Sequence, residues 1–141
     1  MYAWVVRKIF EGLIARLNRG DIALIERTLA PDVVLVFAGR SSFAGEHRGK
    51  PAVVAWFRRF VALEPHYAIH DVTVAGPPWS MRIGVLFSDR IPLPGGGDYR
   101  NAGMEYVRMR WGRLEEIRVH LDTEKVAELD ERLELAAAAM S

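Results

Sequence analysis

From His66 to Asp122 the sequence alternates between apolar and polar residues, and this long alternation limits the available folds more than any other feature. A period of two predicts strands at 66–76 and 81–91, and two more in the run from Met104 to Thr123. Gly76-Pro77-Pro78 ends the first strand, PLPGGGD forms a loose hairpin loop, and Trp111-Gly112 forms a tight turn. The pattern therefore predicts a meander of long antiparallel strands.

The rest of the chain has mostly the apolar spacing of helices. It predicts helices over 4–18, 22–29 and 51–63, a strand over 32–39 followed by a loop, and a last helix that begins at Asp122. We predict one α+β domain, residues 1–141, with helices on one face of a curved sheet. The other sheet face is then left for solvent or a partner.

Composition excludes several classes of protein. Nineteen basic against eighteen acidic residues give a formal charge of +1, which is too small for the basic surface that binds nucleic acid. The chain has no cysteine, so disulfides, zinc–thiolate sites and cysteine nucleophiles are excluded. No apolar run reaches the roughly 20 residues that span a bilayer, and the N-terminal residues lack the order of a signal peptide. We therefore expect a cytoplasmic protein that binds neither nucleic acid nor membranes.

Glu105 is the first candidate for chemistry, because it is an acid on an apolar strand face. The rest of that face, on this strand and the next, is apolar: Val107, Met109, Ile117, Val119 and Leu121. In an apolar cavity, desolvation would raise the pKa of the Glu105 carboxyl group and make it a useful proton donor or base. The structural alternative is a buried glutamate that is hydrogen-bonded to a tyrosine or a backbone group.

Asp89 and His47 are the other candidates. Asp89 alternates with apolar residues of its strand, so it can share acid and base work with Glu105; the structural alternative is a turn cap or an ion pair. His47 lies in the loop before the third helix. A histidine at a pocket rim can shuttle protons because it titrates near neutrality, and the alternative is a histidine that is only solvated.

The remaining polar residues give no metal or cofactor site. His120 and Asp122 form a His-x-Asp pair, but alternation places them opposite the apolar face, and Asp122 has a simpler role as a helix N-cap. Neither this pair nor His66 with His70 has a third ligand at suitable spacing. The chain also lacks a Gly-x-Ser-x-Gly elbow and a phosphate loop that ends in Gly-Lys-Ser/Thr. We expect no metal and no cofactor.

Three motifs, met in order along the chain, carry a family resemblance. They are LNRGD with LAPDVVLVF, then FAGEHRGKPAVVAWF, then DYRNAGMEYVRMRWGRLEEIRVHLDTEKV. Together they resemble the SnoaL-like branch of the nuclear-transport-factor-2-like (NTF2-like) superfamily, which has the ketosteroid-isomerase-like fold. The resemblance covers nearly the whole chain. It implies a cone-shaped α+β domain, commonly a homodimer, with a pocket between the helices and the concave sheet.

The resemblance implies no single activity, because the superfamily includes isomerases, cyclases, epoxide hydrolases and non-catalytic binders. Alignment with ketosteroid isomerases places Phe37 where those enzymes have an aspartate base, and Leu13 where they have a tyrosine. Their third group, a neutral carboxylic acid, falls close to Glu105. Steroid-type isomerisation by that set of residues is therefore not expected.

These observations support two hypotheses. In the first, the protein binds a small, largely apolar molecule in the cone and acts as a cofactor-independent isomerase, cyclase or hydrolase, with Glu105 as the central acid/base and Asp89 or His47 assisting. The pocket wall is expected to come from Leu13, Phe37, Trp56, Phe57, Phe60, Phe87, Val107 and Val119. In the second, the domain is a non-catalytic ligand binder or a protein-association module, which hydrocarbon at positions 13 and 37 favours.

Overall fold

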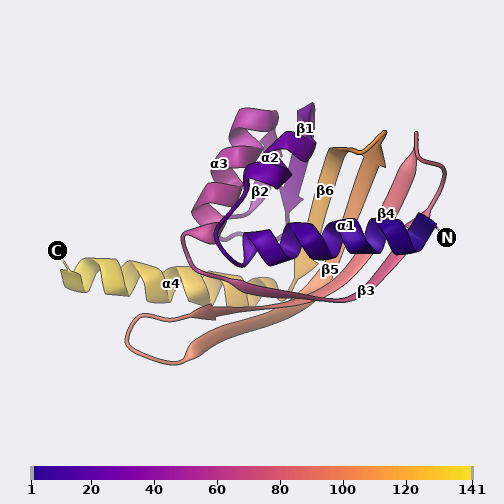
Figure 1. Ribbon diagram of the computed structural model, residues 1–141. Coiled ribbons are helices and arrows are strands. Elements are labelled where there is room, and N and C mark those ends of the chain that lie inside the picture. The colour runs from indigo at the N-terminus through magenta and orange to yellow at the C-terminus, as the bar shows by residue number, and fades with distance from the viewer. Residues whose placement is uncertain (1, 141) are drawn as a thin grey trace.

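The computed structural model describes residues 2–140 as an open, curved sheet of six strands with helices on its concave face (Figure 1). The elements are α1 (Tyr2–Leu17), α2 (Ala23–Thr28), β1 (Leu29–Phe37), β2 (Gly45–Arg48), α3 (Lys50–Val61), β3 (His66–Ala75), β4 (Met81–Pro92), β5 (Asp98–Arg110), β6 (Arg113–Leu121) and α4 (Thr123–Met140). The strand order is β2-β1-β6-β5-β4-β3, and only β1 and β6 pair in parallel. The predicted cone-shaped α+β fold with a mixed sheet is confirmed.

The helices cover the sheet with apolar stripes. Helix α1 lies across the strands and packs on β3, while α3 packs on β1 and β2 (Figure 1). The buried residues of α1 are spaced three or four apart, as one face of a helix requires: Val6, Phe10, Leu13 and Leu17. Pro51 stands in the first turn of α3, where its missing N–H leaves no helical bond unmade.

Helix α4 packs on β5 with its first turns and then continues past the sheet (Figure 1). Asp122 caps it, because Oδ1 accepts the backbone N–H groups of Glu124 at 3.1 Å and Lys125 at 3.4 Å. The predicted capping role is therefore confirmed. No helix within residues 2–140 is long and apolar enough to cross a membrane.

The predicted meander is also confirmed, and its last turn is tight. Strands β5 and β6 join through Trp111 and Gly112, whose φ angles of 49° and 78° match the positive values of a two-residue type I′ turn. Residues 45–48 differ from expectation: the sequence predicts a loop there, and the structure forms the edge strand β2, antiparallel to β1. Four exposed or half-buried residues are too few to show alternation in the sequence.

A bulge between Ile69 and Asp71 changes which residues of β3 face the core. Beyond the bulge, Val72 pairs with Val85. Before it, Tyr67 pairs with Asp89. The extra residue shifts the register by one position, so Tyr67, and not Ala68, lies opposite Asp89.

Gly103 provides a test of how closely the strands approach. A β-carbon on Gly103 would overlap the carbonyl oxygen of His120 and come within 2.8 Å of the Leu121 Cβ. We expect Gly103→Ala to lower the free energy of unfolding by about 1–3 kcal/mol, because the neighbouring backbone must shift. Gly12→Ala is the matched control, since a β-carbon there meets nothing within 4 Å and alanine favours helix by about 1 kcal/mol. Urea unfolding followed by circular dichroism measures both, and equal effects would contradict the prediction.

Candidate functional site

The space between the helices and the concave sheet contains a cavity, walled by side chains from all four helices and five of the six strands. Its volume is about 90 Å³. That value lies below the range of about 300–1,000 Å³ for sites that hold drug-sized ligands, so the cavity suits only a small molecule.

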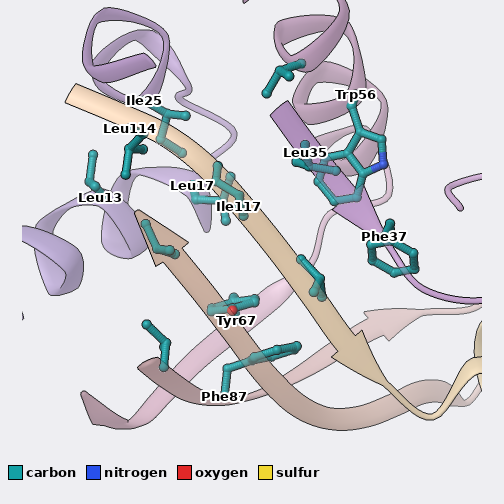
Figure 2. Close-up of a cluster of buried hydrophobic side chains, with 14 of the residues drawn as sticks. Leu13, Leu17, Ile25, Leu35, Phe37, Trp56, Tyr67, Phe87, Leu114 and Ile117 are labelled. Atoms are coloured by element: carbon teal, nitrogen blue, oxygen red, sulfur yellow. The ribbon is translucent and has the colours of Figure 1, made fainter. Parts of the chain in front are cut away.

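The wall of this cavity is almost entirely apolar. All eight predicted pocket residues line it: Leu13, Phe37, Trp56, Phe57, Phe60, Phe87, Val107 and Val119. Figure 2 shows Trp56 beside Phe37, with ring centroids 5.6 Å apart, and Tyr67 stacked on Phe87 at 4.7 Å. That these residues contact a ligand stays a prediction.

Glu105 points its carboxyl group into this apolar surrounding from β5. Tyr67 donates a hydrogen bond from its hydroxyl group to Glu105 Oε1. Burial raises the pKa of Glu105 to about 7; the hydrogen bond from Tyr67 opposes this shift, and the charge of Asp89 adds to it. Near neutral pH the group is therefore present both as an acid and as a base.

Tyr67 is held in place by its backbone as well as by its ring. The side chain of Asn18, just beyond α1, accepts the Tyr67 backbone N–H and donates to the Tyr67 carbonyl, each at 2.8 Å. Burial, with the negative charge of Glu105, raises the pKa of Tyr67 well above its ordinary value. The phenol therefore stays protonated and remains a hydrogen-bond donor.

Asp89 is the second acid of the cavity. It is 7% exposed, lies on β4 opposite Tyr67, and lines the same space as Glu105. Its Oδ1 is buried and has no hydrogen-bond partner among the described residues. Burial raises the pKa of Asp89 to about 6, and a hydrogen bond from its own backbone opposes this shift. The cavity thus combines two carboxyl groups that exchange protons near neutrality, as acid/base sites do.

His47 lies apart from these two acids. It is half-buried on β2, with Nε2 3.2 Å from the carbonyl oxygen of Phe43, and it is not among the residues that line the cavity. The same carbonyl oxygen accepts a hydrogen bond from the Trp56 indole at 3.0 Å. His47 therefore supports the loop behind the pocket wall. His120 is exposed on the outer sheet face, as alternation predicts.

The structure adds three polar residues that the sequence did not single out. Tyr67 bonds Glu105, Tyr99 lines the cavity, and Asn101 donates to the Tyr99 hydroxyl at 2.8 Å and to the carbonyl of Asp122 at 2.9 Å. Tyr99 and Asn101 alternate with Glu105 along β5, so strand period alone places them on its face. Tyr67 carries no such signal, because the bulge in β3 breaks the alternation. Within residues 2–140, no three His, Cys, Asp or Glu side chains cluster closely enough to hold a metal ion.

The cone-shaped α+β fold is shared with solved NTF2-like proteins. Residues 10–117 match the SnoaL-like domain family, and the chain belongs to this family. No curated protein matches the sequence significantly.

Solved structures share the fold at low identity. Bal32a, from a soil-derived mobile gene cassette, is 20% identical with a TM-score of 0.77, over 88% of this chain and 95% of that chain. An NTF2-like protein from Burkholderia pseudomallei is 23% identical with a TM-score of 0.74, over 88% and 95%. A Mycobacterium tuberculosis protein in complex with estradiol-17β-hemisuccinate is 19% identical with a TM-score of 0.69, over 79% and 89%. These identities establish a common fold and no activity.

The raised pKa values predict how stability depends on pH. Both carboxyl groups favour their neutral form in the folded chain, so their stabilising effect is complete below about pH 4 and is lost as pH rises through about 6 for Asp89 and about 7 for Glu105. We expect each group to lower the free energy of unfolding by about 2–3 kcal/mol between pH 4 and pH 8.

Chemical denaturation of the wild type, Glu105→Gln and Asp89→Asn across this range measures the effect. Each variant should gain stability relative to the wild type as pH rises. Glu131→Gln, an exposed change on α4, should follow the wild type. Parallel curves for all four proteins would show that the two acids are not desolvated.

Proposed function

We propose that this protein binds a small, largely apolar molecule in its cavity and catalyses proton transfer on it without a cofactor. The reaction is of the isomerase, cyclase or hydrolase type. The observation that carries the proposal is the pair of carboxyl groups, Glu105 and Asp89, with pKa values of about 7 and 6 in one apolar cavity. Carboxyl groups without a charged partner in an apolar cavity reduce the stability of the fold. Acids with strongly shifted pKa values cluster at functional sites.

The two acids suit complementary roles. At neutral pH, Asp89 is mostly ionised and can accept a proton from the ligand, while Glu105 is about half protonated and can donate one. Tyr67 occupies Oε1 of Glu105, so Oε2 is available to a ligand oxygen. One proton leaves the ligand for Asp89 and another reaches it from Glu105, so the ligand is rearranged with no net change in protons.

The ligand class is inferred from the wall of the cavity. A lining of aromatic and aliphatic side chains favours an apolar body with few polar groups. The Mycobacterium tuberculosis structure, with estradiol-17β-hemisuccinate bound, supports this class because it shares the fold. The cavity volume of about 90 Å³ favours a molecule smaller than a steroid. A cytoplasmic setting is proposed from the composition, since a chain without cysteine is suited to a reducing compartment.

The second candidate function is ligand binding without catalysis. Leu13 and Phe37 favour it, because both are buried hydrocarbon on the cavity wall where ketosteroid isomerases carry working groups. Binding without turnover would then depend on the apolar wall alone. Proton exchange on the ligand distinguishes the two functions.

A homodimer through the outer face of the sheet is also proposed. Leu86, Met104 and Tyr106 are 43%, 57% and 38% exposed on the neighbouring strands β4 and β5, and Leu86 pairs with Met104. Charged residues surround them, among them Glu116 with its partners Arg108 and Arg118 at 2.6 Å each. An apolar centre with a polar rim is typical of an interface between copies.

Glu105→Gln tests the catalytic proposal. Terpenoid, polyketide and aromatic ketones are first screened for binding by thermal shift, and deuterium uptake from D2O at their acidic C–H positions is then followed by NMR. We expect exchange in the wild type and a loss of about 10²- to 10⁴-fold in Glu105→Gln, because the general acid/base is removed. Glu131→Gln is the control and should exchange like the wild type. Binding without exchange would favour the non-catalytic function, and no binding would favour a protein-association domain.

Met104→Arg tests the dimer. A charge placed at the centre of a self-complementary apolar patch is repeated in both copies, so it should raise the dimer dissociation constant by about tenfold or more. Sedimentation equilibrium measures the constant. Leu135→Arg replaces a residue that is 68% exposed on α4 and should leave the constant unchanged. A wild type that is monomeric at high concentration would contradict the proposal.

A further inference from the structure

Asp89 Oδ1 is a buried acceptor without a donor. The residue is 7% exposed, and no side chain or backbone group among the described residues bonds this oxygen. A buried polar atom left unpaired lowers the stability of the folded chain, and most such atoms in native proteins have a partner. No described residue donates a hydrogen bond to this oxygen.

The donors nearest along the sheet are already engaged. Tyr67, opposite Asp89 on β3, gives its hydroxyl proton to Glu105. Asn101, opposite Asp89 on β5, gives its amide protons to Tyr99 at 2.8 Å and to the carbonyl of Asp122 at 2.9 Å. Tyr99 forms no hydrogen bond to Asp89 in the described chain. Asp89 thus lines the cavity and has one buried, unpaired oxygen, on a wall that is mostly apolar.

We propose that the ligand carries a hydroxyl group and donates it to Asp89 Oδ1. This inference rests on the proposed function, because it names a polar group of the ligand that the same cavity binds. Asp89 on β4 and Glu105 on the neighbouring strand β5 line the same cavity, so a ligand that is bonded to Asp89 lies on the sheet face that carries Glu105.

A neutral hydroxyl fits this position better than an ammonium group. A cation would have to give up its hydration inside an apolar cavity, whereas a hydroxyl loses far less. Water can also bond Oδ1, so a ligand must reproduce that hydrogen bond to displace it without loss. An analogue that lacks the donor leaves the acid unpaired and is rejected. The site is therefore expected to select alcohols, phenols or enols over their ethers.

Matched probe pairs test this selection. Isothermal titration calorimetry compares 2-naphthol with 2-methoxynaphthalene, and carvacrol with carvacrol methyl ether, on the wild type, Asp89→Leu and Glu131→Gln. We expect the hydroxyl member of a pair to bind the wild type and Glu131→Gln at least tenfold more tightly than its ether. Asp89→Leu, which has similar volume and no acceptor, should bind both members about equally.

The wild type alone is sufficient to overturn the inference, so it does not depend on whether Asp89→Leu folds. Equal binding of a hydroxyl compound and its ether to the wild type would refute the hydroxyl subsite while leaving the apolar-ligand function intact. If folded Asp89→Leu still binds the hydroxyl compound more tightly than its ether, the ligand hydroxyl donates to a group other than Asp89, and the inference is also refuted. If no member of either pair binds, both the inference and the proposed ligand-binding function fail for this cavity.

Discussion

The hydrogen bond from Tyr67 to Glu105 makes it feasible for an apolar sheet face to carry a carboxyl group, and several parts of the fold serve that bond. The bulge in β3 turns Tyr67 inward, the side chain of Asn18 holds its backbone from the end of α1, and Phe87 stacks on its ring. A neutral phenol accompanies the acid without adding a second charge. Glu105 is thereby held inside the cone with a pKa of about 7, and its Oε2 has no hydrogen bond among the described residues.

Asp89, unlike Glu105, has no side chain among the described residues that donates a hydrogen bond to its Oδ1. Its neighbours Tyr67 and Asn101 donate their hydrogens elsewhere, so one of its oxygens is unpaired in a surface that is mostly apolar. An unpaired buried oxygen lowers the stability of a protein, and a bound donor offsets that loss. We propose that the unpaired acid and the apolar wall are two parts of one binding site, in which the wall provides affinity and the acid provides selection.

Regular periodicity in the sequence predicts most of the fold and of the cavity wall, and the features that it misses lie where the period is broken or too short. Alternation predicts the strands, places Glu105 on the inner face, and places Asp89 on a face shared with apolar residues; all eight predicted wall residues line the cavity. Tyr67 cannot be found this way, because an unbroken register would set Ala68 opposite Asp89. Edge strand β2 is too short to show a period. The position of His47 behind the wall depends on how the loop at Phe43 folds, which local patterns do not specify.

A tyrosine bonded to Glu105 agrees with a structural role as well as a functional one, so the bond alone does not decide between them. The surrounding cavity wall favours the functional role. At positions 13 and 37 the same cavity carries leucine and phenylalanine, and both side chains are buried. Hydrocarbon side chains therefore pack well in this wall. A purely structural interior would gain stability from hydrocarbon at positions 89 and 105 too. Two acids in this mostly apolar wall, one bonded to a single phenol and one with an unpaired oxygen, therefore support the proposed ligand site.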